Sequence, residues 1–165
     1  MITDQLRAAA VALASPFVAG WEAFRAVPYL CPTGHWTIGF GATEYPDGSP
    51  VKEGDPAISV DTALDMLRSG LIRETIAISK TITRTPTVHQ LAALLSFAYN
   101  VGVYGAERST LVRLFDQGYV NATAAHFLDW DKGRDKSGNL VEIPGLRNRR
   151  EAEQKLFETP DKLAA

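Results

Sequence analysis

The sequence has few of the residues that crosslink a small protein. Among its 165 residues there is one cysteine, Cys31, and there are three histidines, none of them in an HExxH-type spacing. A single cysteine cannot form an internal disulfide or supply a thiolate zinc cluster. We therefore expect a chain that folds without an oxidising compartment and has no zinc site of these two kinds.

Long apolar runs are also missing. The best candidate, residues 8–20, follows Asp4, has only Arg7 as a nearby basic residue and is interrupted by Pro16. A membrane-spanning helix needs about 20 apolar residues, and a secretory signal begins with a basic region. We expect a helix that packs on the protein body, with no clear signal peptide and no stable membrane insertion. A weak membrane-targeting anchor is the alternative.

Basic residues are scarce in the first part of the chain. Residues 1–66 carry 3 basic and 8 acidic side chains, whereas residues 67–165 carry 14 basic and 11 acidic ones. The net charge of −2 gives no overall attraction to nucleic acid. Two parts of unlike charge suit a cleft that holds an anionic polymer. The alternative is two solvated surfaces of chance composition.

Helix and turn signals divide the N-terminal third. The pattern predicts a helix over about 3–14, then a restart at Ser15-Pro16 and a second helix over about 16–25 that carries Glu22 and stops at Pro28. Residues 29–58 are rich in aromatic, β-branched and turn residues, which predicts an antiparallel β region of three short strands.

Helical periodicity governs the rest of the chain. Ser59 can cap a long connecting helix that ends near residue 80, and Thr87 with Gln90 has capping-box spacing before an apolar helix that ends near Asn100 and Gly102. Further helices are expected over 109–117 and 121–130 and after Pro144, with a loop or exposed hairpin over 131–143. The fold class is α+β, mostly helical.

We expect one domain over residues 1–165. Its parts are a helical extension (1–20), a catalytic β-containing lobe (21–58), a connecting helix (59–80) and a helical lobe (81–165).

The spacing of Glu22, Cys31 and Thr37 suits cleavage of a glycosidic bond. This reaction needs a protonated acid on the leaving oxygen and a second group on the other face of the sugar. Glu22 stands between Trp21 and Phe24, and an apolar environment keeps a carboxylic acid protonated near neutrality. Cys31 and Thr37 follow after eight and five intervening residues.

This segment resembles the lysozymes and endolysins of tailed bacteriophages, glycoside hydrolase family 24. Their signature is Glu, eight residues, Asp or Cys, five residues, Thr, within an aromatic context followed by Trp-Thr-Ile-Gly. Four later segments resemble the family in the same order: SFAYNVG (96–102), STLVRLF (109–115), FLDW (127–130) and PGLRNRREAEQKLF (144–157). The resemblance covers about residues 15–158.

The resemblance implies a lysozyme-like fold with a cleft between a small β lobe and a larger helical lobe. It implies an endolysin that hydrolyses the β-1,4 bond between N-acetylmuramic acid and N-acetylglucosamine of peptidoglycan, without a cofactor. Glu22 would be the general acid, Cys31 would assist the water or the oxocarbenium centre, and Thr37 would position the water. The chain would be a monomer made in the host cytoplasm that acts on glycan strands in the periplasm or cell wall.

Several residues keep two interpretations. Cys31 is either chemically active or a structural thiol, and Thr37 is either a water-positioning residue or an ordinary strand residue. Two departures from the family pattern are Ala23, where glycine is usual, and Ala42, where histidine is usual.

Asn100, Arg149 and Arg150 are candidates for substrate binding. Asn100 could instead simply end its helix. One arginine of the last helix could pair with Glu22 across the cleft, or the arginines could form a solvated face with i,i+4 partners.

Two other functions remain open at this stage. A lytic transglycosylase needs only the acid and no water-positioning partner, and gives anhydro-muramic ends. A non-catalytic cell-wall binding or structural module would bind walls without releasing products.

Overall fold

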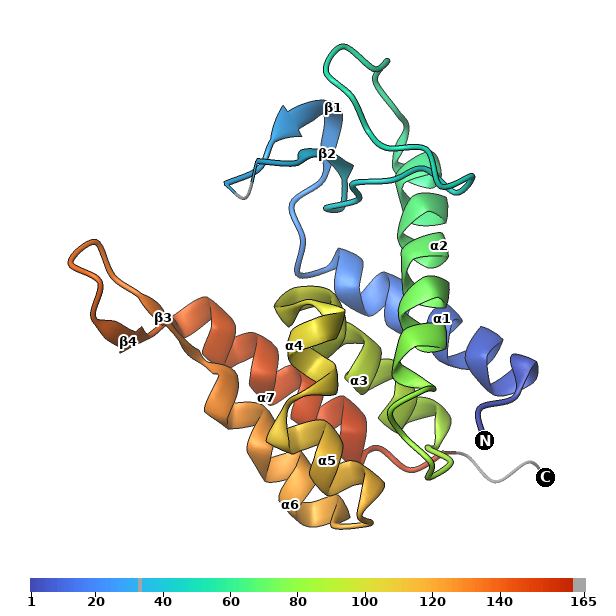
Figure 1. Ribbon diagram of the computed structural model, residues 1–165, viewed down its shortest axis with the longest axis vertical. Coiled ribbons are helices and arrows are strands. Elements are labelled where there is room, and N and C mark those ends of the chain that lie inside the picture. Colours follow the sequence, from blue (N-terminus) through green and yellow to red (C-terminus); the bar gives the residue numbers. More distant parts are fainter. Residues whose placement is uncertain (33, 162–165) are drawn as a thin grey trace.

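Two hydrophobic cores of unequal size organise the molecule, and residues of one long helix belong to both. This helix joins the upper and lower parts of the molecule in Figure 1. The computed structural model describes residues 1–32 and 34–161. Its helices are α1 (Asp4–Ala19), α2 (Val60–Ile78), α3 (Val88–Val101), α4 (Val103–Glu107), α5 (Thr110–Asp116), α6 (Val120–His126), the 3₁₀ helix η1 (Phe127–Trp130) and α7 (Pro144–Glu158). Its strands are β1 (Arg25–Leu30), β2 (Trp36–Gly39), β3 (Lys132–Arg134) and β4 (Leu140–Glu142).

Helix α1 differs from the prediction, which divided this segment in two. It runs without a break from Asp4 to Ala19, with Pro16 inside it. Its buried residues Ala10, Val11, Ala14 and Val18 recur every three or four positions on both sides of the proline and belong to the larger core. Burial of this continuous stripe offsets the missing N–H of Pro16. Residues 21–25, predicted to be helical, form a linker and the start of β1.

The small lobe is built on the antiparallel pair β1–β2, with Tyr29 opposite Thr37. The register shifts between Arg25 and Tyr29, and Pro28 lies in that interval, where a residue without an N–H is tolerated. In place of a third strand, the chain makes two isolated bridges, Ile38–Ala42 and Glu44–Pro50.

Helix α2 joins the two lobes, as predicted. The Ser59 hydroxyl accepts from the Thr62 N–H at its start. Met66 packs with Ile38 and Val51 in the small core, whereas Leu67 on the adjacent position belongs to the large core. One helix thus sets the relative position of both lobes.

Helix α3 is the centre of the helical lobe. The predicted capping box is present, because Thr87 accepts from Gln90 N–H and the Gln90 side chain accepts from Thr87 N–H. All residues over 91–98 are buried, and Phe97 packs edge-on against Trp130 with ring centroids 5.1 Å apart. Gly102, with a φ of +84°, ends the helix, and the short helix α4, which was not predicted, follows.

The C-terminal third brings α7 against α3 and projects a hairpin. The segment predicted as a loop or hairpin forms β3 and β4, which extend away from the body in Figure 1. The helix expected over 121–130 begins one residue earlier, at Val120, and is divided into α6 and the 3₁₀ helix η1. Over the described residues, none of the helices combines the length and apolar character needed to cross a membrane.

Candidate active site

Glu22 lies between α1 and β1. This linker carries the chain from the helical lobe to the small lobe in Figure 1. Its N–H donates to the Val18 carbonyl at 3.2 Å, so its backbone is tied to the last turn of α1. The prediction placed it inside a second helix; the structure places it just beyond the helix cap Gly20. Its side chain is 26 % exposed. The carboxyl group is therefore held in place and still open to a ligand.

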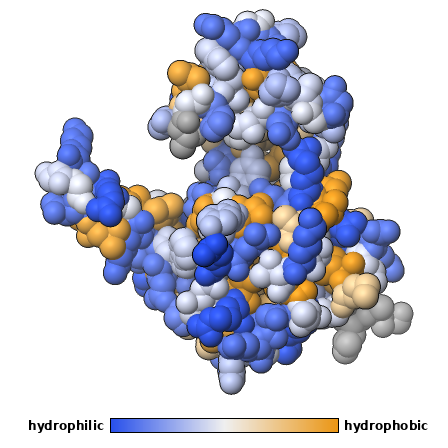
Figure 2. All heavy atoms as spheres, viewed as in Figure 1, coloured by the Kyte–Doolittle hydropathy of each residue, from blue (hydrophilic) through white to orange (hydrophobic). Residues whose placement is uncertain are grey.

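A pocket of about 340 Å³ surrounds this carboxyl group, and we call it the Glu22 pocket. The linker, α3, the end of the β3–β4 hairpin and the start of α7 contribute its walls. Its lining residues are Trp21, Glu22, Asn100, Ile143, Gly145, Leu146 and Arg149. Figure 2 shows that the surface is hollowed between the small lobe and the hairpin. Segments distant in sequence therefore meet around one carboxylate.

Arg149 makes the closest contact to that carboxylate. Its Nη1 donates to Glu22 Oε1 at 2.6 Å, and Arg149 itself is only 4 % exposed. Charge-assisted hydrogen bonds of this length are strong in a partly buried site. The sequence indicated that one arginine of the last helix could reach Glu22, and the structure brings Arg149 to it.

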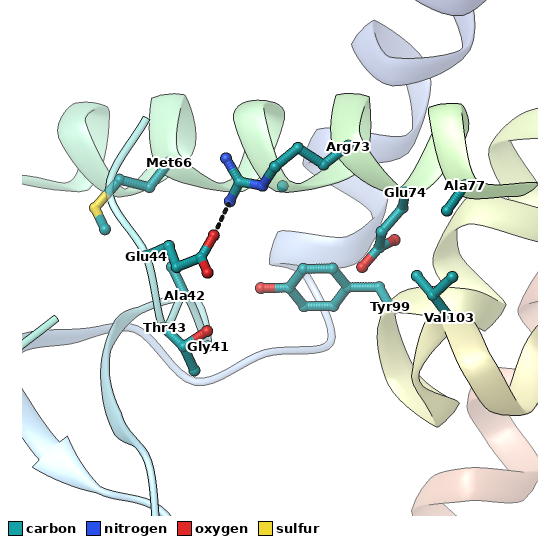
Figure 3. Close-up of a pocket in the computed structure, with 11 residues that line it drawn as sticks. Gly41, Ala42, Thr43, Glu44, Met66, Arg73, Glu74, Ala77, Tyr99 and Val103 are labelled. Carbon is teal, nitrogen blue, oxygen red and sulfur yellow. Dashed lines mark ion pairs between the residues drawn. The ribbon is translucent and has the colours of Figure 1, made fainter. Parts of the chain in front are cut away.

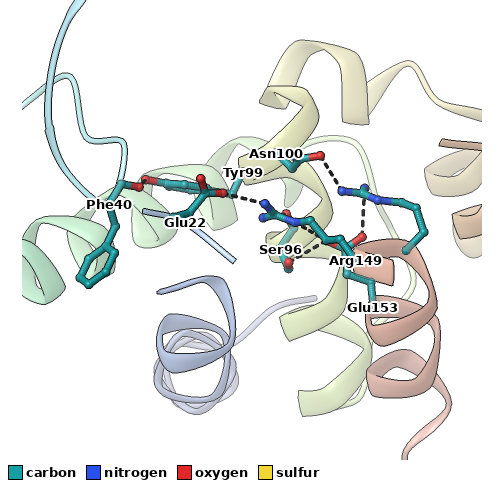
Figure 4. A network of polar contacts seen from close by, with 8 residues as sticks. Glu22, Phe40, Ser96, Tyr99, Asn100, Arg149 and Glu153 are labelled. Carbon is teal, nitrogen blue, oxygen red and sulfur yellow. Dashed lines mark hydrogen bonds and ion pairs between the residues drawn. The ribbon is translucent and has the colours of Figure 1, made fainter. Parts of the chain in front are cut away.

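Glu153 also binds Arg149 and restricts the position of its guanidinium group. Its Oε1 accepts from Arg149 Nε at 3.2 Å and from the Ser96 hydroxyl at 2.7 Å (Figure 4). Glu153 is fully buried, and this burial raises the pKa of its carboxyl group, while the two neighbouring arginines act in the opposite direction. Sequence reasoning missed Ser96, and it considered Glu153 only as an i,i+4 partner of an arginine on a solvated face, whereas the structure buries the pair. The available signals were the i,i+4 spacing of Arg149 and Glu153 and a lone serine in an apolar helix.

Asn100 and Arg150 form a further hydrogen-bonded pair next to Glu153. Arg150 Nη2 donates to Asn100 Oδ1 at 2.5 Å, and Arg150 Nη1 lies 2.9 Å from Glu153 Oε2 in an ion pair without hydrogen-bond alignment. Arg150 has no exposed surface, so direct contact with substrate, which the sequence suggested, is not available to it. It can act only by holding Asn100, which does line the Glu22 pocket.

Cys31 and Thr37 belong to the small lobe. Cys31 follows β1, and its N–H donates to the His35 carbonyl at 3.0 Å across the turn into β2. Thr37 lies in β2, is 3 % exposed, and its hydroxyl donates to the same carbonyl at 3.1 Å. Neither residue is among those that line the Glu22 pocket. Their predicted catalytic roles therefore stay predictions.

Tyr99 links the two lobes next to Glu22 (Figure 4). Its hydroxyl donates to the Phe40 carbonyl at 2.7 Å, and burial raises the pKa of the phenol, with the charges of Glu22 and Glu74 adding to the effect. The phenol therefore remains a neutral donor at any physiological pH. Sequence reasoning did not single out this residue.

The structure offers no metal site within the part of the chain that it describes. There, no three His, Cys, Asp or Glu side chains come together in a way that could hold an ion. His89 contacts Asp161 and His126 contacts Asp129, both away from the Glu22 pocket.

A helical lobe, a small β lobe and one anchored glutamate between them define the lysozyme class of glycoside hydrolases. Residues 19–153 match the model of the phage lysozyme family. The chain belongs to this family.

Individual relatives agree with the assignment. The chain is 31 % identical over 139 residues to an endolysin of Acyrthosiphon pisum secondary endosymbiont phage 1, covering 84 % of this chain and 90 % of that protein. It is 38 % identical over 136 residues to an endolysin of Bacillus phage PZA, covering 82 % of this chain but only 48 % of that relative, so it spans about half of that longer protein.

A solved structure agrees over nearly the whole length. The endolysin from Escherichia coli O157:H7 phage FAHEc1 superposes with a TM-score of 0.72 at 26 % identity, covering 96 % of this chain and 93 % of that one. The lysozyme-like fold and the glycoside hydrolase class expected from the sequence are thus confirmed.

Proposed function

We propose that this protein cleaves the β-1,4 bond between N-acetylmuramic acid and N-acetylglucosamine in peptidoglycan, with Glu22 as the general acid. The observation that carries the proposal is the placement of Glu22. Among the described residues that line its pocket, Glu22 is the only one with a carboxylate. Its Oε1 accepts a hydrogen bond from the nearly buried Arg149.

The reaction places two requirements on Glu22. Its carboxyl must be oriented toward the leaving oxygen, and it must carry a proton when the C1–O bond breaks. Arg149, braced by Glu153, supplies the orientation. A glycan bound in the pocket would shield the carboxyl group from water. Glu22 then gives its proton to the leaving sugar oxygen.

The second half of the reaction belongs to the opposite face of the sugar. A water molecule adds its oxygen to C1 and releases a proton to solvent, which leaves a reducing end. Thr37, or Cys31 at the end of β1, is the proposed group that orients this water. Both lie in the small lobe, across the lobe boundary from the α7 wall of the Glu22 pocket.

The place of action follows from the substrate. We propose that the protein works on glycan strands in the periplasm or cell wall after synthesis in the cytoplasm of a bacterial host, and that it works as a monomer.

Mass spectrometry of digested cell walls tests the proposal. Purified protein added to peptidoglycan should release muropeptides with reducing muramic acid ends. Glu22→Gln should abolish this release while its circular dichroism spectrum stays unchanged. A Glu22→Gln protein that digests walls at the wild-type rate would remove the acid assignment.

The single carboxylate in the pocket also favours a lytic transglycosylase as second candidate. In that reaction the C6 hydroxyl of the muramic acid attacks C1, so no water is positioned. Its products are lighter than the hydrolysis products by one water. Anhydro-muramic ends, together with full activity in Thr37→Ala, would establish this reaction instead.

A further inference from the structure

One residue directly after β2 anchors the small lobe in the helical lobe. Ile38, within β2, packs in the small core, whereas Phe40 belongs to the large core and is 7 % exposed. The Phe40 ring also contacts the ring of Phe24 on the linker, with centroids 5.5 Å apart. The strand that carries Thr37 is therefore followed at once by a side chain that is buried in the other lobe.

Two glycines allow the backbone to make this crossing. Gly39 and Gly41, on either side of Phe40, have φ angles of +65° and +99°, which residues with a side chain rarely adopt. A Cβ on Gly39 would lie 2.9 Å from the Cβ of Ala63 on α2. A Cβ on Gly41 would lie 3.3 Å from the hydroxyl oxygen of Tyr99. The backbone around Phe40 is therefore closely packed against both α2 and Tyr99.

The Tyr99 hydroxyl also binds this backbone directly. It reaches from α3 and donates to the Phe40 carbonyl at 2.7 Å. The Phe40 side chain and its carbonyl are thus both held by the helical lobe, the first by apolar packing and the second by a hydrogen bond. The hydrogen bond adds direction, because it fixes the orientation of the peptide group that follows β2.

Tyr99 stands next to the candidate acid. It lines a pocket of about 480 Å³ that also contains Gly41 and Glu74 (Figure 3), and the next residue of α3, Asn100, lines the Glu22 pocket. After burial, the charge of Glu22 is the next contribution that raises the pKa of the Tyr99 phenol. One side chain is therefore close to Glu22 and bonded to the segment that follows Thr37.

The separation of the two proposed catalytic groups depends on this junction. Glu22 is held by the helical lobe, through Val18 of α1 and Arg149 of α7. Thr37 lies in the small lobe, three residues before Phe40. An acid on one face of a sugar and a water on the other must keep a fixed separation, and a displacement of about 1 Å can cost roughly a hundredfold in rate.

We propose that Tyr99 is a positioning residue, whose hydroxyl fixes β2 against the helical lobe and so sets the separation between Glu22 and the water-orienting group of the small lobe. The proposal rests on the proposed function for the reaction, but the contact between the lobes is measured without turnover. Loss of the hydroxyl should therefore lower kcat and leave KM nearly unchanged.

Kinetics of Tyr99→Phe test the positioning role. This variant removes the hydroxyl and keeps the ring in its place. On soluble peptidoglycan fragments we expect kcat to fall about tenfold, with a change of less than about twofold in KM, because the glycan still binds while the lobes are held less firmly. Tyr99→4-aminophenylalanine returns an N–H donor to the same position and should recover most of the lost kcat.

Tyr45→Phe is a matched control for lost stability. The Tyr45 hydroxyl donates to Asp55 Oδ2 at 3.0 Å, and this bond lies within the small lobe. Each of the two Tyr→Phe variants should lower the melting temperature by about 2–4 °C, because each loses about one hydrogen bond. Only Tyr99→Phe should lose kcat. Equal losses of kcat in the two variants would mean that kcat follows stability, and would overturn the proposal.

Pulsed electron–electron resonance between two spin labels measures the contact between the lobes directly. The labels are attached at Val27→Cys in β1 and Lys155→Cys in α7, both exposed positions, in a Cys31→Ser background. We expect Tyr99→Phe to broaden the distance distribution and Tyr45→Phe to leave it unchanged. An unchanged distribution in Tyr99→Phe overturns the proposal, and so does a wild-type kcat in that variant.

The two proposals can fail separately. Wall digestion by wild type, with an unchanged kcat in Tyr99→Phe, keeps the enzyme and rejects the positioning role. A broadened distance distribution in Tyr99→Phe, with no wall products from wild type, keeps the contact between the lobes and rejects the hydrolase.

Discussion

Glu22 and Glu74 are two glutamates in neighbouring pockets with opposite surroundings. Glu22 has an arginine nitrogen at 2.6 Å, and that arginine is braced by a buried carboxylate. Glu74 has a buried oxygen with no partner in the described structure, and its adjacent Arg73 points to Glu44 instead. The first arrangement fixes the direction of a carboxyl group, and in the second burial raises the pKa of the carboxyl group to about 8. Two residues of the same type thus differ in their surroundings, and the position of the nearest arginine is the main difference.

The largest effect should come from removing the acid. Glu22→Gln keeps the shape and a contact to Arg149 but has no proton of suitable acidity. We expect kcat on purified cell walls to fall by about a thousandfold, the scale of general acid catalysis. Release of reducing ends measures it, with Glu53→Gln, an exposed carboxylate in the small lobe, as the control. A fall of less than tenfold would mean that the acid is another group.

Loss of Glu153, which pairs with Arg149 and Arg150, should have the next largest effect. Glu153→Leu leaves Arg149 and Arg150 buried without their carboxylate, which should cost about 3–5 kcal/mol of unfolding free energy. Urea denaturation measures the loss. Glu151→Gln, two residues earlier on α7, breaks only the exposed pair with Arg147 and should cost less than about 0.5 kcal/mol. Equal losses of unfolding free energy in the two variants would mean that Glu153 does not stabilise the two buried arginines.

Glu74 should make the stability of the fold fall as the pH rises from about 4.5 to about 8. Its pKa rises from 4.5 to about 8 on folding, so the folded protein keeps a proton that the unfolded chain releases in between. Stability from this group is complete below about pH 4.5 and is lost as pH rises to about 8.

Glu74→Gln has no proton to lose at this position. It should be as stable as wild type near pH 4.5 and roughly 2–4 kcal/mol more stable above about pH 8. Urea denaturation across this range measures the difference. A constant difference between the two proteins at every pH would mean that Glu74 titrates normally.

Thr37 should give the smallest effect. Thr37→Val removes the hydroxyl but keeps the shape in β2, and Thr37→Ser keeps the hydroxyl. If the hydroxyl orients water, Thr37→Val should lose about tenfold in kcat and Thr37→Ser should lose little. Initial rates of wall digestion measure it. Full activity in Thr37→Val with reducing ends in the products would assign the water to Cys31, whereas full activity with anhydro-muramic ends would point to the transglycosylase reaction.

Features encoded by local chemistry could be predicted from the sequence. The Ser59 cap and the Thr87–Gln90 capping box depend on residues three positions apart, and both are present. Glu22 stood out because of its spacing to Cys31 and Thr37. These signals do not require knowledge of which helices touch.

Features decided by packing could not be predicted in the same way. Pro16 indicated a helix break, but burial of α1 against the core outweighs that signal. Glu153 looks like an ordinary helical glutamate until α7 packs on α3 and brings it to Ser96. Glu74 looks like a surface residue of α2 until the loop after β2 and Tyr99 cover it.

The central claim is that Glu22, and not the neighbouring Glu74, is the general acid. Measuring kcat of Glu22→Gln and Glu74→Leu on the same soluble peptidoglycan fragments at about pH 6 tests it most directly. We predict a loss of about a thousandfold in kcat for Glu22→Gln and of less than about tenfold for Glu74→Leu. A large loss of kcat in Glu74→Leu, with Glu22→Gln still active, would contradict the account.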